Sequence, residues 1–191
     1  MERVLLHCCC APCACYPIPE LRREGFEVTG YFSNNNIHPF TEWEKRRGAM
    51  VALAETEQLS VIYDDDYRPV DFFRAVSFRE SRRCLICYQV RLEQTAHIAR
   101  RGKFECFSSS LLVSKHQHHE LISSLGTAAG EKYGVPFLYR DFREGYAVGA
   151  ERSRALGLYR QQYCGCLYSE LERYAPKAVR EQVARERYES I

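Results

Sequence analysis

Short apolar runs alternate with longer segments of helical character along most of the chain. The runs fall at residues 3–8, 27–33 and 59–63, within residues 104–113, and at residues 136–139. Helical segments lie between them, one ending near Gly25 and the others at residues 41–58, 70–78, 86–101 and 117–133. The first run shows no alternation of apolar and polar positions, which is typical of a strand covered on both faces. Strands that alternate with helices favour right-handed crossovers and a parallel sheet.

This pattern predicts an α/β fold class, with a Rossmann-like parallel sheet flanked by helices and followed by a helical C-terminal portion. The sequence contains no repeat of fixed period, no low-complexity run and no linker. Its 191 residues are within the size of one domain. We therefore expect residues 1–191 to form a single domain.

Polar loops follow several of the predicted strands. Residues 8–10 come at the end of the first strand, and the asparagines 34–36 follow the second. The serines 108–110 lie near the end of the fourth strand, and Asp141 follows the fifth. Because the carboxyl ends of parallel strands meet at one edge of a sheet, we expect the functional site at this edge.

Ten cysteines are the most informative part of the composition. Nine of them fall in three clusters, and Cys106 stands alone in an apolar run as a small buried residue. The clusters are Cys8, Cys9, Cys10, Cys13 and Cys15; Cys84 and Cys87; and Cys164 and Cys166. In a cytosolic chain thiols stay reduced, so this clustering indicates metal or redox chemistry rather than a disulfide scaffold.

The sequence shows neither a secretory leader nor a membrane span. Its start, MERVLLHCCC, lacks the cationic segment, long apolar stretch and small-residue cleavage site of a leader, and no apolar run approaches about eighteen residues. We expect a cytoplasmic protein with no membrane partner. The net charge is only +2, but 22 arginines stand against 5 lysines. Compositional bias and contact with RNA both account for this excess, and the sequence leaves the two open.

The pair Cys84 and Cys87 has the C-x-x-C spacing at the start of a predicted helix. This spacing brings two sulfur atoms together near backbone N–H groups. A zinc ion, an iron–sulfur cluster and a thioredoxin-like dithiol all use such a pair, so the pair alone does not decide between them.

The pair Cys164 and Cys166 has only Gly165 between its members. A disulfide across one residue closes a small strained ring, and strained disulfides are the labile, catalytic kind. Gly165 provides the backbone freedom that brings the two sulfur atoms together. The pair is therefore either a redox-active dithiol or two ligands of a second metal.

Several short motifs follow one another along the chain. The first is His-Cys-Cys-Cys-Ala-Pro-Cys at residues 7–13, and the later ones are Asn-Ile-His-Pro at 36–39, Cys-Leu-Ile-Cys-Tyr at 84–88 with Arg-Leu at 91–92, serine-rich residues 109–114, Asp-Phe-Arg at 141–143, and residues 159–166. In kind and in order they resemble the motifs of one family, the cobalamin-independent epoxyqueuosine reductases known as QueH, whose opening motif is H-x-C-C-A-P-C. The resemblance covers roughly residues 3–169. Pro17 and Pro19 depart from it, because they interrupt the expected first helix, and Cys8 and Cys15 are thiols beyond the motif.

The resemblance implies a set of cofactor ligands. Cys9 and Cys10 match the family's donors and, with Cys84 and Cys87, would hold a 4Fe-4S cluster. Structural zinc and the absence of metal are the alternatives. A mononuclear iron beside the cluster is a further option, with Cys13 and Asp141 as its candidate ligands, because a mixed thiolate and carboxylate site suits iron.

The resemblance also implies the reaction, which is the reduction of epoxyqueuosine to queuosine at the wobble position of tRNA, without cobalamin. The anticodon loop is single-stranded, so the modified base can be splayed into a pocket. The segment 159–163 mixes tyrosines with hydrogen-bonding side chains that suit such a base. Cys164 and Cys166, with Cys13 and Asp141, are the expected catalytic residues, and an electron donor is the second expected partner.

Two other hypotheses compete with this one. A tRNA thiolation enzyme on a related fold would place a phosphate-binding loop after the first strand, but such loops are rich in Gly and Ser, and this one is Cys-Cys-Cys-Ala-Pro-Cys. A non-enzymatic zinc or iron–sulfur binding module is the second alternative. A closed structural site has no use for the Cys164–Cys166 pair, which favours an enzyme.

Overall fold

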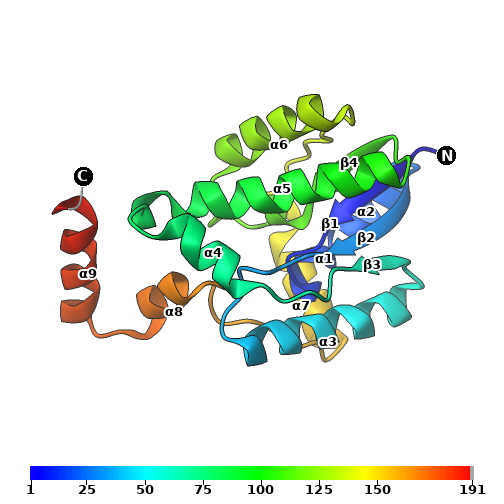
Figure 1. The fold of residues 1–191 in the computed structure, drawn as a ribbon. Coiled ribbons are helices and arrows are strands. Elements are labelled where there is room, and N and C mark those ends of the chain that lie inside the picture. The colour runs from blue at the N-terminus through cyan, green and yellow to red at the C-terminus, as the bar shows by residue number, and fades with distance from the viewer. Residues whose placement is uncertain (190–191) are drawn as a thin grey trace.

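A parallel sheet of four strands forms the centre of the molecule (Figure 1). The structure is a computed structural model that describes residues 1–189, and it describes side chains as far as residue 183. The strands are β1 (Arg3–His7), β2 (Glu27–Phe32), β3 (Val61–Tyr63) and β4 (Cys106–Ser109). Their order in the sheet is β3-β2-β1-β4, and every pair is parallel. This confirms the predicted α/β class.

The helices connect the strands and cover the sheet. Between the strands run α1 (Ala11–Ala14), α2 (Pro17–Arg23), α3 (Phe40–Glu57), α4 (Pro69–Val76) and α5 (Arg83–Arg101); after β4 come α6 (His119–Tyr133), α7 (Tyr146–Ala155), α8 (Leu167–Tyr174) and α9 (Lys177–Glu189). Helix α5 packs against β1 and β4 and lies beside α6, whereas α2 packs against β2 (Figure 1). Short 3-10 helices occur at Glu80–Arg82, Ser110–Val113 and Arg143–Gly145.

Strand β1 is in the middle of the core, as its uniformly apolar sequence predicts. Val4, Leu5 and Leu6 are fully buried, with β2 on one side and β4 on the other. Burial on both faces explains why the run shows no alternation. The carboxyl end of β1 therefore opens into the middle of one edge of the sheet.

The predicted fifth strand at residues 136–139 is reduced to one parallel bridge, between Phe107 and Phe137. Pro136 has no N–H group to extend the ladder. The carbonyl of Leu138 accepts its bond from the hydroxyl of Ser108, at 2.8 Å, instead of from a backbone N–H. The segment lies against β4 without forming a strand.

The predicted first helix is two short helices. Pro17 is in the first turn of α2, where a missing N–H group leaves no bond unmade, so the chain restarts there after α1 ends at Ala14. This break frees α1 to follow the cysteine loop as a separate single turn.

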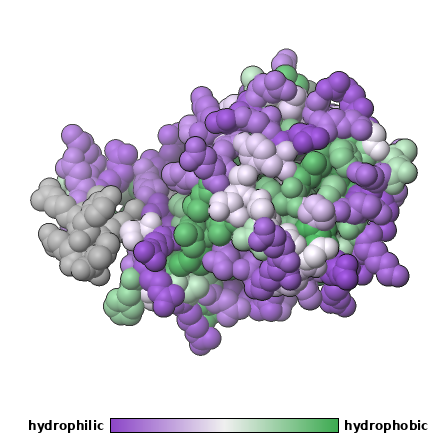
Figure 2. Space-filling view, turned by 90° about the horizontal axis from the view of Figure 1, so that it is seen from above, coloured by the Kyte–Doolittle hydropathy of each residue, from purple (hydrophilic) through white to green (hydrophobic). Residues whose placement is uncertain are grey.

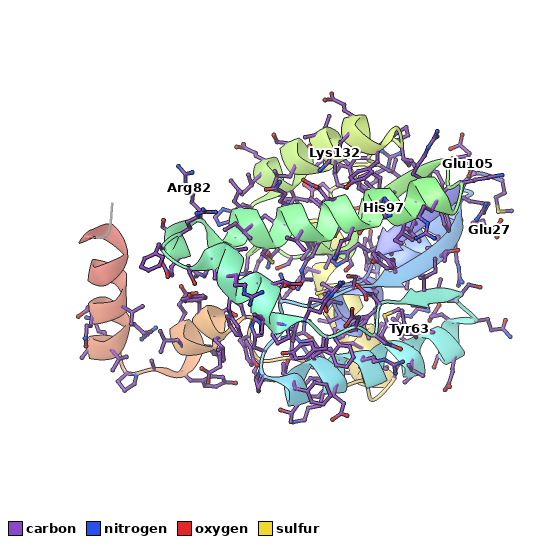
Figure 3. The ribbon with its side chains drawn as sticks, viewed as in Figure 1. Glu27, Tyr63, Arg82, His97, Glu105 and Lys132 are labelled. Carbon is purple, nitrogen blue, oxygen red and sulfur yellow. The ribbon has the colours of Figure 1, made fainter. Side chains whose placement is uncertain are left out.

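The surface is charged, and no helix within residues 1–189 has the length and apolarity to cross a membrane. The face in Figure 2 is mostly hydrophilic, with apolar side chains gathered in its middle. In Figure 3, Arg82 lies near the start of α5 and Glu105 beyond its end, and both side chains point outward. Within α5 itself, cysteines occur only in the first turn, at Cys84 and Cys87.

Candidate functional site

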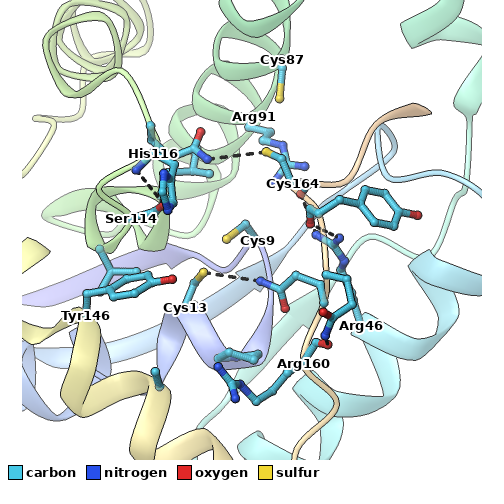
Figure 4. A pocket seen from close by; sticks show the side chains of 18 of the residues that line it. Cys9, Cys13, Arg46, Cys87, Arg91, Ser114, His116, Tyr146, Arg160 and Cys164 are labelled. Atoms are coloured by element: carbon cyan, nitrogen blue, oxygen red, sulfur yellow. Dashed lines mark hydrogen bonds between the residues drawn. The ribbon is translucent and has the colours of Figure 1, made fainter. Parts of the chain in front are cut away.

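A cavity of about 480 Å³ lies at the carboxyl edge of the sheet. Its walls come from the loop after β1, from α3, α5 and α7, from the segment after β4, and from the segment before α8 (Figure 4). Segments far apart in sequence therefore meet here, at the edge where the polar loops were expected to converge. Cys9, Cys13, Cys87 and Cys164 line the cavity.

Cys9, Cys10 and Cys13 form the tightest group of thiols. Their sulfur atoms all lie within 4.8 Å of one another, and those of Cys9 and Cys10 are 3.9 Å apart. Cys10 is extended, with φ −169° and ψ 161°, and α1 begins directly after it. This turn places the side chains of the adjacent residues Cys9 and Cys10 close to that of Cys13. Three sulfur atoms at this separation can bind one metal ion or cluster.

Polar side chains fix this group of thiols. The backbone N–H of Cys9 donates to Ser110 Oγ at 3.0 Å, and that hydroxyl donates to Cys9 Sγ at 3.3 Å. Gln161 Nε2 donates to Cys10 Sγ at 2.8 Å, while Gln161 Oε1 is buried without a partner in the described part of the chain. N–H and O–H groups aimed at sulfur are what thiolate ligands of a metal commonly receive.

The charges in the group are unequal. Hydrogen bonds from the Cys10 and Cys13 thiols hold the pKa of Cys9 well below its usual range, and the nearby Arg91 acts in the same direction. Burial raises the pKa of Cys10 well above its usual range, and the hydrogen bonds that Cys13 makes to Cys10 and Cys9 raise its own. Of the three sulfur atoms, Cys9 is therefore the one at which the surroundings most favour a negative charge.

The C-x-x-C pair lies in the first turn of α5, on another wall of the cavity. Cys87 faces the cavity, and its sulfur accepts a hydrogen bond from Asn36 Nδ2 at 2.8 Å. Asn36 Oδ1 in turn accepts from Arg91 at 2.6 Å. Burial raises the pKa of Cys87 to about 12. Cys84 is half-buried, and it is not part of the group of sulfur atoms within 4.8 Å.

Cys164 and Cys166 are both free thiols in a loop that closes the cavity. Cys164 is exposed and accepts a long hydrogen bond from Gln117 Nε2 at 3.5 Å (Figure 4). Gly165 between them has φ +149°, and a Cβ atom there would be 3.2 Å from Ile37. Only glycine adopts this backbone conformation readily. The conformation of this loop therefore requires glycine at position 165.

Arg46 holds this loop and was not foreseen from the sequence. It is 2% exposed, and its guanidinium donates to the carbonyls of Cys164 at 2.8 Å and Tyr163 at 3.0 Å. Its Nε donates to Glu42 at 2.7 Å, and Tyr159 also donates to Glu42. Two charges four residues apart on a helix normally indicate a solvent-exposed pair, so the sequence contained no signal of this burial.

Two cationic side chains are buried around the thiols, and a buried histidine is neutral. Arg46 and Arg91 are 2% and 5% exposed, and Arg91 Nη1 has no hydrogen-bond partner among the groups that the structure describes. Burial lowers the pKa of His7 to about 3, and its Nδ1 lies 2.9 Å from Ser109 Oγ. The positive charge at the cavity therefore comes from arginine, which favours thiolates and other anionic groups.

Asp141 is not brought together with the cysteines. It is exposed, and its carboxylate accepts hydrogen bonds from Arg143, with Nε at 2.8 Å. These bonds lower the pKa of Asp141 to about 2. The carboxylate is not among the groups that could share a metal with Cys9, Cys10 and Cys13. The predicted metal role of Asp141 finds no support in this geometry, whereas Cys13 joins the two predicted ligands Cys9 and Cys10.

The residues present fit a thiolate-bound metal cluster. Cysteine sulfur atoms face the cavity from α1 and from α5, and Asn36, Ser110 and Gln161 donate to them. The unpartnered Nη1 of Arg91 adds a buried donor without an acceptor. A buried polar group without a partner is costly unless a ligand satisfies it. An anionic cluster with sulfur atoms as acceptors meets this requirement.

A parallel α/β sheet with clustered free thiols and buried arginines at its carboxyl edge is the class of site that suits metal or redox chemistry. The sequence comparisons agree. A sequence model described as "Epoxyqueuosine reductase QueH" matches residues 4–172, and the chain belongs to this family.

Curated relatives of that name cover most of the chain. The protein from Dehalococcoides mccartyi is 41% identical over 172 residues, which is 90% of this chain and 94% of the relative. The one from Thermotoga maritima is 39% identical over 183 residues, covering 91% and 93% of the two chains. The one from Streptococcus pyogenes is 33% identical over 178 residues, covering 87% and 69%. The expected resemblance to this family is thereby confirmed.

Proposed function

We propose that the protein reduces epoxyqueuosine in tRNA to queuosine, with a 4Fe-4S cluster bound at the cavity by cysteines. The convergence of Cys9, Cys10 and Cys13 within 4.8 Å, beside Cys87 on the same cavity, carries the proposal. Membership of the family supports the substrate, and a reducing cytoplasm suits ten free cysteines. The thiolation alternative has lost its support, because the chain belongs to a family of reductases.

The reaction replaces an epoxide by an alkene. Both carbon–oxygen bonds of the epoxide break, two electrons and two protons enter, and the oxygen leaves as water. A bound cluster would supply single electrons and a Lewis-acidic iron. Cobalamin has no part in this scheme.

The chain's own residues would hold the cluster and shape the space beside it. Of the proposed ligands, Cys9 and Cys87 line the cavity, and the sulfur atom of Cys10 lies within 4.8 Å of that of Cys9. Cys84 is the fourth predicted ligand. Cys13 is close enough to Cys9 and Cys10 to serve instead of Cys84, or to bind a second iron. Gln161 and Asn36 would orient the sulfur atoms by the hydrogen bonds that they already make.

Cys164 and Cys166 are the proposed redox pair. As thiols they can give up two electrons and two protons when they form a disulfide, which matches the two electrons and two protons of the reaction. Cys164 is exposed at the cavity, where an external reductant could reach it. Arg46 would keep the pair at the cavity through its bonds to the backbone of the loop.

The central test is a reaction. Protein purified without oxygen and reconstituted with iron and sulfide is mixed with dithionite and tRNA carrying epoxyqueuosine, without cobalamin. Mass spectrometry of the digested tRNA should show loss of one oxygen from the modified nucleoside. A protein with a full complement of iron and sulfide that leaves the nucleoside unchanged would refute the proposed substrate.

The ligand set is tested by serine variants of single cysteines. Cys9→Ser and Cys87→Ser should lower bound iron and the visible absorption of the reconstituted protein, and should reduce turnover by at least about 100-fold. Cys106→Ser is the matched control, because Cys106 is a buried cysteine in β4 outside the cavity. Full iron content in Cys87→Ser would remove Cys87 from the ligands, and Cys13→Ser and Cys84→Ser, compared side by side, identify the fourth ligand.

A further inference from the structure

The rim of the cavity carries positive charge and no negative charge. Four arginines line the cavity, Arg46, Arg91, Arg160 and Arg173, and no aspartate or glutamate lines it among the described residues. Arg46 and Arg91 are buried and hydrogen-bonded to groups of the protein. They belong to the inner part of the cavity, where the thiols are.

The other two arginines have a different environment. Arg160, in the segment before α8, and Arg173, on α8, are exposed. Among the side chains that the structure describes, up to residue 183, neither guanidinium makes a hydrogen bond or an ion pair. Two exposed, unpaired arginines on a cavity that no described carboxylate lines are suited to binding an anionic polymer. Arg binds phosphate in a bidentate manner and is the preferred residue for that purpose.

Three tyrosines line the same cavity, and among the described residues only one of them is exposed and has a hydroxyl without a hydrogen-bond partner. Tyr88 is 3% exposed, and its hydroxyl donates to Gln117. Tyr163 donates to the carbonyl of His38, and the Arg46 guanidinium lies 5.7 Å from its ring centre. Tyr146, at the start of α7, is 40% exposed, and its hydroxyl makes no hydrogen bond to the described residues.

Tyr146 also points the right way for a ligand. In Figure 4 its side chain projects into the cavity from α7, toward Cys13, and Arg46 lies on the opposite wall. Lys115 Nζ lies 5.8 Å from its ring centre and adds a further positive charge on this side. An exposed aromatic ring beside unpaired cations is the arrangement by which proteins hold single-stranded nucleotides.

We propose that Tyr146 stacks on the modified base of the tRNA, and that Arg160 and Arg173 bind the phosphates next to it. This inference rests on the proposed function and names the residues that would deliver the nucleotide to the thiol-lined part of the cavity. The predicted base-binding segment 159–163 contributes Arg160 as a phosphate ligand, while its two tyrosine hydroxyls are engaged with the protein itself.

The phosphate contacts are tested by the salt dependence of tRNA binding. Reconstituted Arg160→Ala and Arg173→Ala are titrated with fluorescent tRNA carrying epoxyqueuosine at increasing KCl. Each variant should lower the slope of log affinity against log salt by about 0.7, the value for one contact to a single strand. Arg101→Ala is the matched control, since Arg101 is exposed at the opposite end of α5, and its slope should equal that of the wild type. Wild-type slopes in both rim variants would overturn the assignment.

The stacking contact is tested by the Michaelis constant for tRNA with dithionite as reductant. Tyr146→Ala should raise it by about 5-fold to 150-fold, whereas Tyr146→Phe, which keeps the ring, should stay close to the wild type. Tyr139→Ala is the control, because Tyr139 is 37% exposed and does not line the cavity. Equal losses in Tyr146→Phe and Tyr146→Ala would overturn stacking.

The two proposals fail in different ways. Suppose that the wild type binds tRNA, that the rim variants bind it less well, and that the wild type nevertheless converts no epoxyqueuosine. The proposed reaction is then refuted and the binding surface stands. If the wild type converts epoxyqueuosine and the rim variants behave like it, the surface is refuted and the reaction stands. Iron content and far-UV circular dichroism must match the wild type in every variant compared.

Discussion

Two cysteine regions meet at the cavity, and they are built in opposite ways. Cys9, Cys10 and Cys13 are buried or half-buried, lie within one turn of chain, and follow a central strand directly. The loop of Cys164 and Cys166 comes after β4 and α7, is open to solvent at Cys164, and is held mainly from outside by Arg46 and the backbone of His38. In the first region consecutive residues bring the sulfur atoms together, and the distant Ser110 and Gln161 add hydrogen bonds to a turn that is already formed locally. In the second region the loop itself is held by contacts across more than a hundred residues.

The difference indicates which substitutions should disturb each region. A change near β1 alters the thiol ligands themselves, because the turn and the ligands are the same residues. A change on α3 leaves every cysteine in place and yet releases the second region. Substitutions in and around the two regions should therefore differ in how strongly they change the stability of the protein.

Arg46→Met should destabilise the protein strongly and loosen the Cys164–Cys166 loop. It leaves Glu42 buried without its cation and removes the donors to the carbonyls of Cys164 and Tyr163. Breaking one side of a buried ion pair costs about 3–5 kcal/mol. Urea denaturation of the metal-free protein measures this. Arg47→Met, on the next position of the same helix, breaks an exposed pair with Asp65 and should cost less than about 1 kcal/mol. Equal effects would show that Arg46 has no special role.

Gly165→Ala should cost about 1–3 kcal/mol, because φ +149° is strained for alanine and the new Cβ would be 3.2 Å from Ile37 and 3.3 Å from Arg46. Gly157→Ala is the control, since Gly157 has φ +62° with open space around it and should cost only about 1 kcal/mol. The rate at which Cys164 reacts with a thiol reagent should rise in the Gly165 variant alone. An unchanged rate would mean that the loop does not depend on this glycine.

His38 should make the metal-free protein less stable in mild acid. Its backbone N–H donates to Gly165 O at 2.7 Å. Its buried ring stacks on the ring of Phe73, with the two ring centres 4.5 Å apart. Burial, together with the nearby charge of Arg91, lowers the pKa of His38 to about 4. In the unfolded chain the ring takes up its proton near pH 6.5, so stability is complete above that pH and falls as the pH drops toward 4.

The variant His38→Phe isolates that effect, because it keeps the stacking and the backbone bond but has no titrating group. Between pH 6.5 and 5.5 it should lose about 1 kcal/mol less unfolding free energy than the wild type. His97→Phe is the comparison, since His97 is exposed on α5. Identical pH profiles for His38→Phe and the wild type would contradict a buried neutral ring.

Asp141→Asn should have the smallest effect, and it separates the structure from the sequence-based hypothesis. The Asp141–Arg143 pair is exposed, so its loss should change stability by less than about 0.5 kcal/mol. The pKa of Asp141 is lowered to about 2, so any contribution is present above its ordinary pKa near 4 and is lost only as the pH falls toward 2. Iron content should equal that of the wild type. Reduced iron would restore Asp141 as a metal ligand.

Much of the architecture was predictable because it is local. Strand and helix periods, the break at Pro17 and the position of the cysteine turn after β1 follow from residue order. The fifth strand was predicted wrongly. The Ser108 hydroxyl takes the place of a backbone donor to Leu138, and Pro136 has no N–H group to donate, so the ladder of backbone hydrogen bonds does not extend there. Arg46 and Tyr146 were missed because nothing about an arginine on a charged helix, or a tyrosine after a glycine, reveals what it faces.

Residue order alone was enough to specify an α/β chain of reductase character with three groups of cysteines. Folding decided which of those cysteines share a point in space, since parallel strands bring loops about a hundred residues apart to one edge. It added Cys13 to the pair Cys9 and Cys10 and left Asp141 paired with Arg143 instead. It also buried two arginines beside the thiols and left two at the rim. Burial and proximity are properties of the packed sheet and helices, and no short stretch of the chain contains them.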